Sequence, residues 1–487
     1  MTTQPLEPGR FHPSIGRRIG ASDRRKREAE SPVRAVLDEP IPGGASLAYV
    51  FGSGLLYLFL SQVVTGMFLA LYYVPSADHA HTTVAYLTKE VTSGSFIRSI
   101  HAYGSSAIVI VLLLHIGQTF LYGAYKGRRK LLWLAGCALF ALMLGMSFTG
   151  YLLPWDQKAY FATTVGTNIL TYIPLIGGPL KSLLRGGAEM GTLTLSRFFV
   201  LHVFLLPALI LAFIAAHVFL FRRAGPAGPV QGDPQTLKRR TEPFYPKQVV
   251  FDLMFALLII GCLGLLAHYL PVALGPKANP SDTHYVPRPE WYYIPVFQWL
   301  KYWESGFAVL GILVIPAFVG LLFVALPFLD RRPERRPWKR PVSVSIYGFI
   351  FIGLGALGGI SHRNDLRDPA IVPQLAKQQA DVDAFMKRPF EPELAGVSPF
   401  AAMSLSPVAS QGKKVFESER CIECHGADLS GTSSAPSLLG VAQKHDAAKL
   451  RSILLQPSEA MADGGMQPVD VKEEDLKALV AFLESLK

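Results

Sequence analysis

The sequence predicts an all-α membrane protein in which seven transmembrane helices precede a small all-α domain. Half of the 487 residues are hydrophobic and 17% are charged, whereas soluble domains carry about 25% charged residues. Seven stretches of 20 or more residues lack Asp, Glu, Lys and Arg, and each can cross a core of about 30 Å as a helix. They lie between Gly43 and Ala77, Arg98 and Lys126, Lys130 and Asp156, Arg197 and Arg222, Asp252 and Lys277, Glu304 and Asp330, and Arg340 and Arg363.

The net charge of +11 indicates membrane topology rather than nucleic-acid binding. The N-terminal arm and the even-numbered connections carry 24 Lys and Arg residues, and the connections on the opposite side carry nine. Because basic residues concentrate on the cytoplasmic side of membrane proteins, the N-terminus is expected in the cytoplasm. An odd number of spans then places the C-terminal domain outside. Multi-pass insertion in a bacterial inner membrane is the predicted localisation.

Composition predicts five segments along the chain. Residues 1–42 form a basic cytoplasmic arm. This arm has no apolar run of the kind found in a cleavable signal peptide, so no such peptide is expected. Residues 43–225 hold the first four spans and 226–362 the last three. Residues 363–404 mix charges and prolines and are predicted to be a linker, either flexible or folded on the surface. Residues 405–487 form the small domain.

Four histidines inside two spans predict a pair of haem sites. His101 and His115 lie fourteen residues apart, and His202 and His217 lie fifteen apart, so each pair keeps roughly one face of its helix over a rise of about 21 Å. Two antiparallel helices can then hold one haem b with His101 and His202 and another with His115 and His217. A single intramembrane histidine is more often a packing residue, but matched pairs favour ligation.

Glycines on the two remaining helices of this four-helix bundle repeat the same period. Gly52 and Gly66 are fourteen residues apart, as are Gly136 and Gly150. Missing side chains would let flat porphyrins approach, although glycine in a membrane helix can simply aid helix packing. Arg98 and Arg197, at the ends of the histidine helices, can pair with haem propionates or can be ordinary boundary charges.

These motifs resemble cytochrome b of respiratory bc and photosynthetic bf complexes. The matching stretches are Phe51–Ser53, Gln62–Gly66, Arg98–His101, Gly150–Gln157 and Ile173–Gly186. The fifteen-residue spacing and Trp155-Asp156-Gln157 are similar to the bf and Gram-positive branch. In the bf branch a cysteine of the first helix anchors an extra haem, and Val50 takes its place here. A third haem in this half of the chain is therefore not expected.

The resemblance identifies Pro289-Glu290-Trp291-Tyr292, between the fifth and sixth spans, as an outer quinol-oxidation site. Glu290 would accept a proton released from quinol, and the alternative is an ordinary helix-capping acid. Tyr151 and Tyr292 would line the pocket. The inner quinone site is poorly signalled: Arg222, Gln248 and Asp252 are candidates that can equally be boundary residues.

The C-terminal domain resembles a class I cytochrome c. Cys421-Ile422-Glu423-Cys424-His425 is the attachment motif for haem c, with two thioether bonds and His425 on the iron. A thiol redox pair or a zinc site is the rival interpretation, but zinc would want a second pair of ligands. The second axial ligand should be a methionine. Met466 is favoured over Met461 because it stands just before the final helix, as in the family.

The resemblance implies a quinol:cytochrome c oxidoreductase that works by a Q cycle. One quinol electron would pass to a separate Rieske iron–sulfur protein, the c haem and a further cytochrome c or oxidase. The other would cross two b haems to quinone from the membrane pool. A homodimer within a larger complex is expected, without nucleic acid. Two alternatives remain: a non-bifurcating di-haem anchor for a dehydrogenase, and a haem-bearing structural subunit whose c domain only docks partners.

Overall fold

The computed structural model describes residues 32–230, 234–282, 284–303, 305–391, 405–426, 429, 431, 435–458, 461–462 and 466–486. Contacts divide the chain into two compact units, Met1–Glu391 and Pro392–Lys487. Of the predicted N-terminal arm, residues 1–31 lie outside the described residues.

Seven helical segments of the described residues are long and apolar enough to cross a membrane, which confirms the predicted fold class. They comprise α3 (Val50–Ala70), α5 (Gly94–Leu121), α6 (Lys130–Tyr151), α9 (Thr192–Val200) continued by η4 (Leu201–Leu205) and α10 (Leu206–Ala224), α12 (Lys247–Tyr269), η6 (Leu310–Val314) with α14 (Ile315–Leu329), and α15 (Pro341–Arg367).

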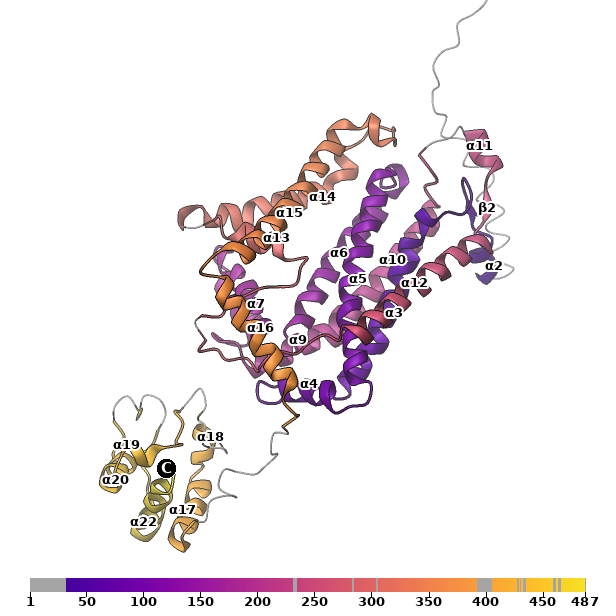
Figure 1. Cartoon of the computed structure of the whole chain (residues 1–487). Helices are drawn as coiled ribbons and strands as arrows, with labels where there is room; N and C mark the ends of the chain where they lie inside the picture. Colours follow the sequence, from indigo (N-terminus) through magenta and orange to yellow (C-terminus); the bar gives the residue numbers. More distant parts are fainter. Residues whose placement is uncertain are drawn as a thin grey trace, which may run out of the picture. The chain divides into compact units, whose positions relative to one another are not determined.

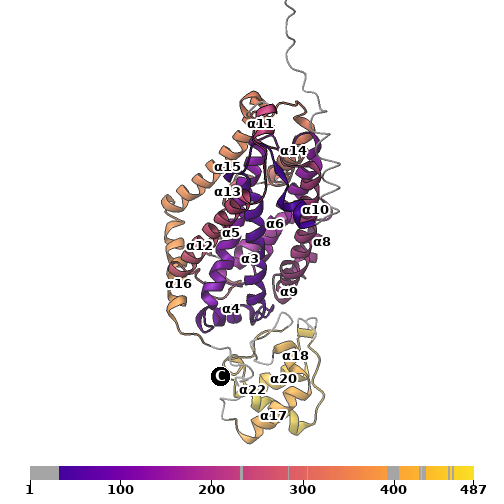
Figure 2. The same ribbon diagram turned by 90° about the vertical axis from the view of Figure 1, so that its right-hand side faces the viewer.

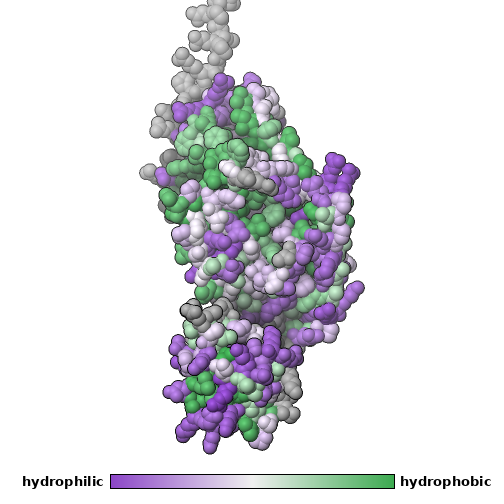
Figure 3. Space-filling view, turned by 90° about the vertical axis from the view of Figure 1, so that its left-hand side faces the viewer, coloured by the Kyte–Doolittle hydropathy of each residue, from purple (hydrophilic) through white to green (hydrophobic). Residues whose placement is uncertain are grey.

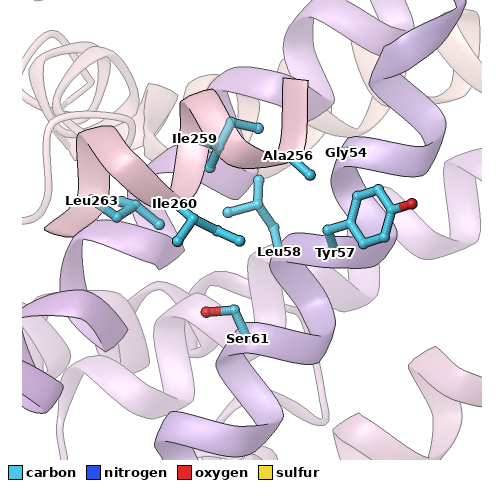
Figure 4. Close-up of a pocket in the computed structure, with 8 residues that line it drawn as sticks. All are labelled: Gly54, Tyr57, Leu58, Ser61, Ala256, Ile259, Ile260 and Leu263. Carbon is cyan, nitrogen blue, oxygen red and sulfur yellow. The ribbon is translucent and has the colours of Figure 1, made fainter. Parts of the chain in front are cut away.

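The first four spans run side by side as a bundle (Figure 1). Within it α3 contacts α5 and α6 contacts α10, while α12 lies against α3 and α5. A Cβ on Gly54 would stand 2.5 Å from the ring of Phe255, so glycine permits this close approach of α3 and α12. The small hollow in Figure 4, lined by the same two helices, has about 10 Å³ of free volume. That is about the space of one water, too little for a quinone.

The exposed surface of the first unit is rich in apolar side chains, green in Figure 3. On α15, Val342, Phe349 and Ile352 are each more than 70% exposed. Lipid can solvate such side chains where water would penalise them, so their exposure agrees with the membrane assignment.

Shorter elements gather at the two ends of the bundle. Figure 1 shows α4 and the start of α9 at one end, and α2 and α11 at the other. The first span begins in η1 (Leu47–Tyr49) and the third in η2 (Gly127–Arg129). The elements outside the spans are α4 (Ala80–Lys89), α7 (Gln157–Asn168), η3 (Ile169–Tyr172), α8 (Gly177–Arg185), α13 (Ile294–Leu300), η5 (Ser305–Phe307), η7 (Pro337–Lys339), α2 (Pro32–Leu37), α11 (Pro234–Arg239), and the antiparallel strands β1 (Pro40–Ile41) and β2 (Glu242–Pro243).

A buried polar cluster joins the bundle to the last two spans. Asp330 accepts hydrogen bonds from Lys126 at 2.5 Å and from the Tyr125 hydroxyl at 2.6 Å. The Arg340 guanidinium donates to the Tyr125 hydroxyl at 2.7 Å and to the Phe120 carbonyl at 2.9 Å. Because each buried polar group has a partner, the cluster fixes α14 and α15 against α5 and α6.

The predicted linker 363–404 is corrected at its N-terminal end. Residues 363–367 complete α15, and Val372–Lys387 form α16, which runs along the outside of the bundle toward α4 in Figure 2. Pro373 is compatible with the first turn of a helix, and Lys377 pairs with Asp381 at the i,i+4 spacing. The high charge content of this segment therefore predicted a linker where the structure has a helix. Residues 392–404 lie outside the described residues.

The second unit is a small helical domain made of α17 (Pro407–Ser418), α18 (Cys421–His425), α19 (Val441–Lys444), α20 (Ala447–Leu455) and α22 (Glu473–Glu484). Helices α17 and α22 cross closely at Gly412, which has no Cβ. A Cβ at this position would stand only 1.8 Å from the Ala478 carbonyl oxygen. Phe416 and Phe482 pack beside this crossing with ring centroids 5.5 Å apart.

Candidate functional site

The structure brings the four predicted histidines together in two pairs. The ring centroids of His101 and His202 are 6.2 Å apart, and those of His115 and His217 are 6.5 Å apart. An imidazole nitrogen binds a metal at about 2 Å and lies about 1 Å from its ring centre, so two rings flanking one iron have centres about 6 Å apart. Both pairs therefore fit the axial ligands of a haem.

A π-helical turn explains the fifteen-residue spacing in the fourth span. His202 lies in η4, where the N–H of Leu206 bonds to the carbonyl of Leu201. Pro207 follows and has no N–H to continue the regular α-helical pattern. A π turn accommodates one extra residue, so His202 and His217 share a face as two residues fourteen apart would.

Hydrogen bonds orient the first pair. The Thr65 hydroxyl donates to the Ser61 carbonyl at 2.7 Å, and it can therefore accept from Nδ1 of His101 at 3.0 Å. Nδ1 of His202 donates to the Met146 carbonyl at 3.0 Å. Both rings thus keep Nε2 for a metal. Thr65 lies within the quoted Gln62–Gly66 motif, but Met146 contributes only backbone, which no residue pattern signals.

The second pair is less firmly oriented. Among the described residues, Nδ1 of His115 is buried without a hydrogen-bond partner, whereas a weak backbone hydrogen bond with Leu132 acts on His217. A metal bound at Nε2 would leave Nδ1 of His115 unpaired, so this nitrogen does not test the predicted ligation.

Each predicted glycine faces one histidine. A Cβ added at these positions would meet the Cε1 atom of the opposing ring at the following distances: 2.4 Å for Gly150 and His202, 3.1 Å for Gly66 and His101, 3.3 Å for Gly136 and His217, and 3.7 Å for Gly52 and His115. The first three lie below ordinary contact distance. The glycines therefore leave space beside the imidazoles, and the predicted approach of porphyrins to these helices stays a prediction.

The two predicted propionate partners contact backbone. Arg98 is buried and donates to the Val272 carbonyl, and its Nε has no partner among the described residues. Arg197 donates to the Leu183 carbonyl near the end of α8. Arg98 keeps a free donor for an anionic group, whereas Arg197 holds α8 in place.

The segment around Glu290 is attached to four helices. Tyr293 donates its hydroxyl to the Leu144 carbonyl on α6 at 2.7 Å, and Trp291 donates to Ser106 on α5 at 3.3 Å. Arg288 forms an ion pair with Asp365 in the last turns of α15. The Glu290 carboxylate accepts from Lys158 on α7 at 2.9 Å.

Two tyrosines beside Glu290 retain their protons. Tyr151, at the end of α6, donates to the Arg288 carbonyl at 3.2 Å. Burial raises the pKa of Tyr292 to about 12, although hydrogen bonds with Ser147 and Ser105 act in the opposite direction. At neutral pH these phenols are therefore neutral donors.

The three candidates at the other end of the bundle have different partners. Arg222 forms an ion pair with Glu39 at 3.3 Å. Gln248 donates to Asp252 at 3.0 Å and accepts from the Ser46 N–H at 2.9 Å. Gln248 and Asp252 are both buried, so they form a polar pair where α12 begins.

In the second unit, α18 holds the Cys-x-x-Cys-His motif in a single helical turn. Nδ1 of His425 bonds to the Pro436 carbonyl at 3.0 Å, leaving Nε2 for a metal. Met466 lies against the hydrophobic core with Cys421, whereas Met461 is 38% exposed. Both observations favour Met466 as the second axial ligand.

Comparisons with known proteins identify the domains in which these residues lie. Residues 36–225 match the family profile "Cytochrome b/b6/petB", residues 277–376 match "Cytochrome b(C-terminal)/b6/petD", and residues 409–487 match "Cytochrome c". Together these matches define a membrane cytochrome b joined to a cytochrome c domain.

Individual relatives narrow the family. The chain is 35% identical over 309 residues to a cytochrome bc complex cytochrome b subunit of Chlorobaculum thiosulfatiphilum, covering 63% of this chain and 71% of that protein. It is 44% identical over 187 residues to the cytochrome b subunit of the menaquinol:cytochrome c reductase of Geobacillus thermodenitrificans, covering 38% and 84%. A solved hyperthermophilic respiratory Complex III matches with 27% identity and a TM-score of 0.60, covering 71% of this chain and 91% of that one. The chain therefore belongs to the cytochrome b subunits of bc-type quinol:cytochrome c oxidoreductases and carries a C-terminal cytochrome c domain.

Proposed function

We propose that this subunit binds two b haems, one at His101 and His202 and one at His115 and His217, and a covalent c haem at Cys421, Cys424 and His425. The centroid distances within the two histidine pairs carry this proposal. The bound haems supply one-electron redox chemistry. Thr65 and Met146 orient the rings of the first pair, and Met466 is the second axial ligand of the c haem.

Quinol is oxidised beside Glu290, at the end of the bundle that holds the first histidine pair. The Glu290 carboxylate accepts a proton from the quinol hydroxyl, and Tyr151 and Tyr292 border the substrate. One electron leaves toward a Rieske partner and then the c haem, and the other crosses between the two histidine pairs to an inner quinone. Proton release outside and uptake inside complete a Q cycle.

The proposed partners follow from this electron path. Two of the four cysteines lie within spans and two lie in the Cys-x-x-Cys-His motif. Because a Rieske cluster needs two cysteine and two histidine ligands of its own, it belongs to a separate subunit. A further cytochrome c or oxidase receives the electron from the c domain, and two copies of the chain form a homodimer. The charge asymmetry supports a bacterial inner membrane location with the c domain on the periplasmic side.

Glu290→Gln tests this function against a non-bifurcating di-haem anchor. The amide keeps the size of the side chain and cannot accept the proton, so quinol-driven reduction of the haems should fall about 10²-fold or more. Glu189→Gln, an exposed acid in the segment that follows α8, is the matched control. Haem spectra should be unchanged in both variants. Full turnover of the Glu290 variant would support the anchor instead.

A further inference from the structure

Lys158 is the cation that contacts Glu290, and its position in the chain is unusual. It occupies the first turn of α7, whose N-cap Asp156 accepts from the Ala159 N–H at 2.8 Å. A positive charge at a helix N-terminus is disfavoured by the helix dipole. A lysine at this place therefore needs an offsetting interaction, and the 2.9 Å ion pair with Glu290 provides one.

The backbone beneath Lys158 is fixed on both sides. The N–H of Gln157 bonds to the Pro276 carbonyl at 3.1 Å, and the Trp155 carbonyl accepts from Ala278 at 3.0 Å. The ammonium also lies 5.6 Å from the ring centroid of Tyr151, within cation–π range. Lys158 is therefore anchored by its backbone, while its side chain joins two members of the proposed quinol pocket.

Other charged groups also lie near this loop. Arg288 and Asp365 form an ion pair, with which Lys301 interacts electrostatically. Tyr151 interacts with both Glu290 and Asp156, and Tyr292 interacts with Glu290. Removal of Lys158 would thus leave the ionised Glu290 carboxylate without its cationic partner.

We propose that Lys158 is a positioning residue for proton release from Glu290, an inference that rests on the proposed function. Lys158 and Glu290 side chains are 46% and 32% exposed, so the ion pair faces water as well as the pocket. A proton passes from the quinol hydroxyl to the carboxylate, which loses its charge and its hold on the ammonium. The same proton then passes to water, and the ion pair reforms without any other reactant.

The expected size of the effect follows from the exposure of the pair. Lys158 stabilises the ionised carboxylate, so its removal favours the protonated form, which cannot accept a proton. The loss of rate should therefore depend on pH and be largest on the acidic limb of the pH–rate profile, within the modest range for exposed ion pairs. The rate should fall up to about 5-fold on that limb and change little on the alkaline side, with KM unchanged.

The test compares Lys158→Gln, Lys158→Arg and Lys181→Gln in the complete complex, with quinol oxidation measured across pH. Lys181, on α8, carries the same charge in the same connection and should give the wild-type profile. Arginine should restore that profile because it keeps the cation. In a Glu290→Gln background, Lys158→Gln should have no further effect on the remaining rate.

The outcomes separate this inference from the proposed function. A wild-type profile for Lys158→Gln, or an equal loss at every pH with intact haem spectra, would overturn the role of Lys158 while leaving Glu290 as the proton acceptor. Full activity of Glu290→Gln would remove the proposed function itself. If Lys158→Gln lost its haems, the Lys158→Arg profile would decide: a wild-type profile supports the inference, and a shifted one contradicts it.

Discussion

Gly150→Ala tests whether the glycines make room for haem ligands. The new Cβ would stand 2.4 Å from Cε1 of His202, so the ring would have to move by about 1 Å to regain ordinary contact. Overpacking of this kind costs about 1–3 kcal/mol, and alanine returns about 0.5–1 kcal/mol through its helix preference. A net cost near 1–2 kcal/mol corresponds to a 5- to 30-fold loss in haem affinity.

The assay is the b-haem content of the purified subunit, read from difference spectra during haem titration. Gly145→Ala, on the same helix, is the matched control because its Cβ would lie 4.0 Å from Leu206. From histidine contacts alone, the loss of affinity should decrease from Gly150 through Gly66 to Gly52. Equal losses at all three positions would refute that reasoning and would show that contact with the porphyrin outweighs displacement of the imidazole.

Three further predictions follow from single contacts. Thr65→Val removes the acceptor for Nδ1 of His101, so redox titration should find one b-haem midpoint raised by about 20–60 mV, the equivalent of one hydrogen bond, whereas Thr65→Ser should not. Burial acts to raise the pKa of Asp330, but hydrogen bonding by Lys126 holds this pKa below 3.8. Asp330→Asn should therefore lower the free energy of unfolding at neutral pH by about 3–5 kcal/mol, measured by thermal unfolding. The difference from wild type should shrink below about pH 4, because stability from a lowered carboxyl pKa is lost as the group is protonated. Met466→Leu should remove the methionine-ligand absorption of the c haem in optical spectra and retain covalent haem, a result that Met461→Leu should not reproduce.

Helix periodicity explains how much of the haem sites could be predicted from sequence. A constant rise and rotation per residue convert the fourteen-residue interval from His101 to His115 into one face of one helix. For the fifteen-residue interval from His202 to His217, the same rotation per residue of a regular α-helix would place the two side chains about 60° apart around the helix axis. The π turn at Leu201–Leu205 removes this discrepancy, and its sequence signal is Pro207, which a period-based prediction does not use.

Contacts between segments far apart in the chain could not be predicted from the sequence. Lys158 and Glu290 are 132 residues apart, and no local pattern links them. The ion pair of Arg288 with Asp365 likewise depends on how α15 returns past the loop. Motif resemblance located Glu290, whereas only the packing of α7 against the loop identified its partner.

One turn of α6 connects the proposed quinol site to the first histidine pair. The carbonyl of Leu144 accepts from the Tyr293 hydroxyl at 2.7 Å, and the carbonyl of Met146, two residues later, accepts from Nδ1 of His202 at 3.0 Å. Gly150 is one further turn along the same helix. Backbone carbonyls two residues apart on α6 accept both bonds, so the Tyr293 and His202 side chains are held by the same helix. Under the proposed function, α6 therefore both holds the loop that borders the quinol and orients the ring of one haem ligand.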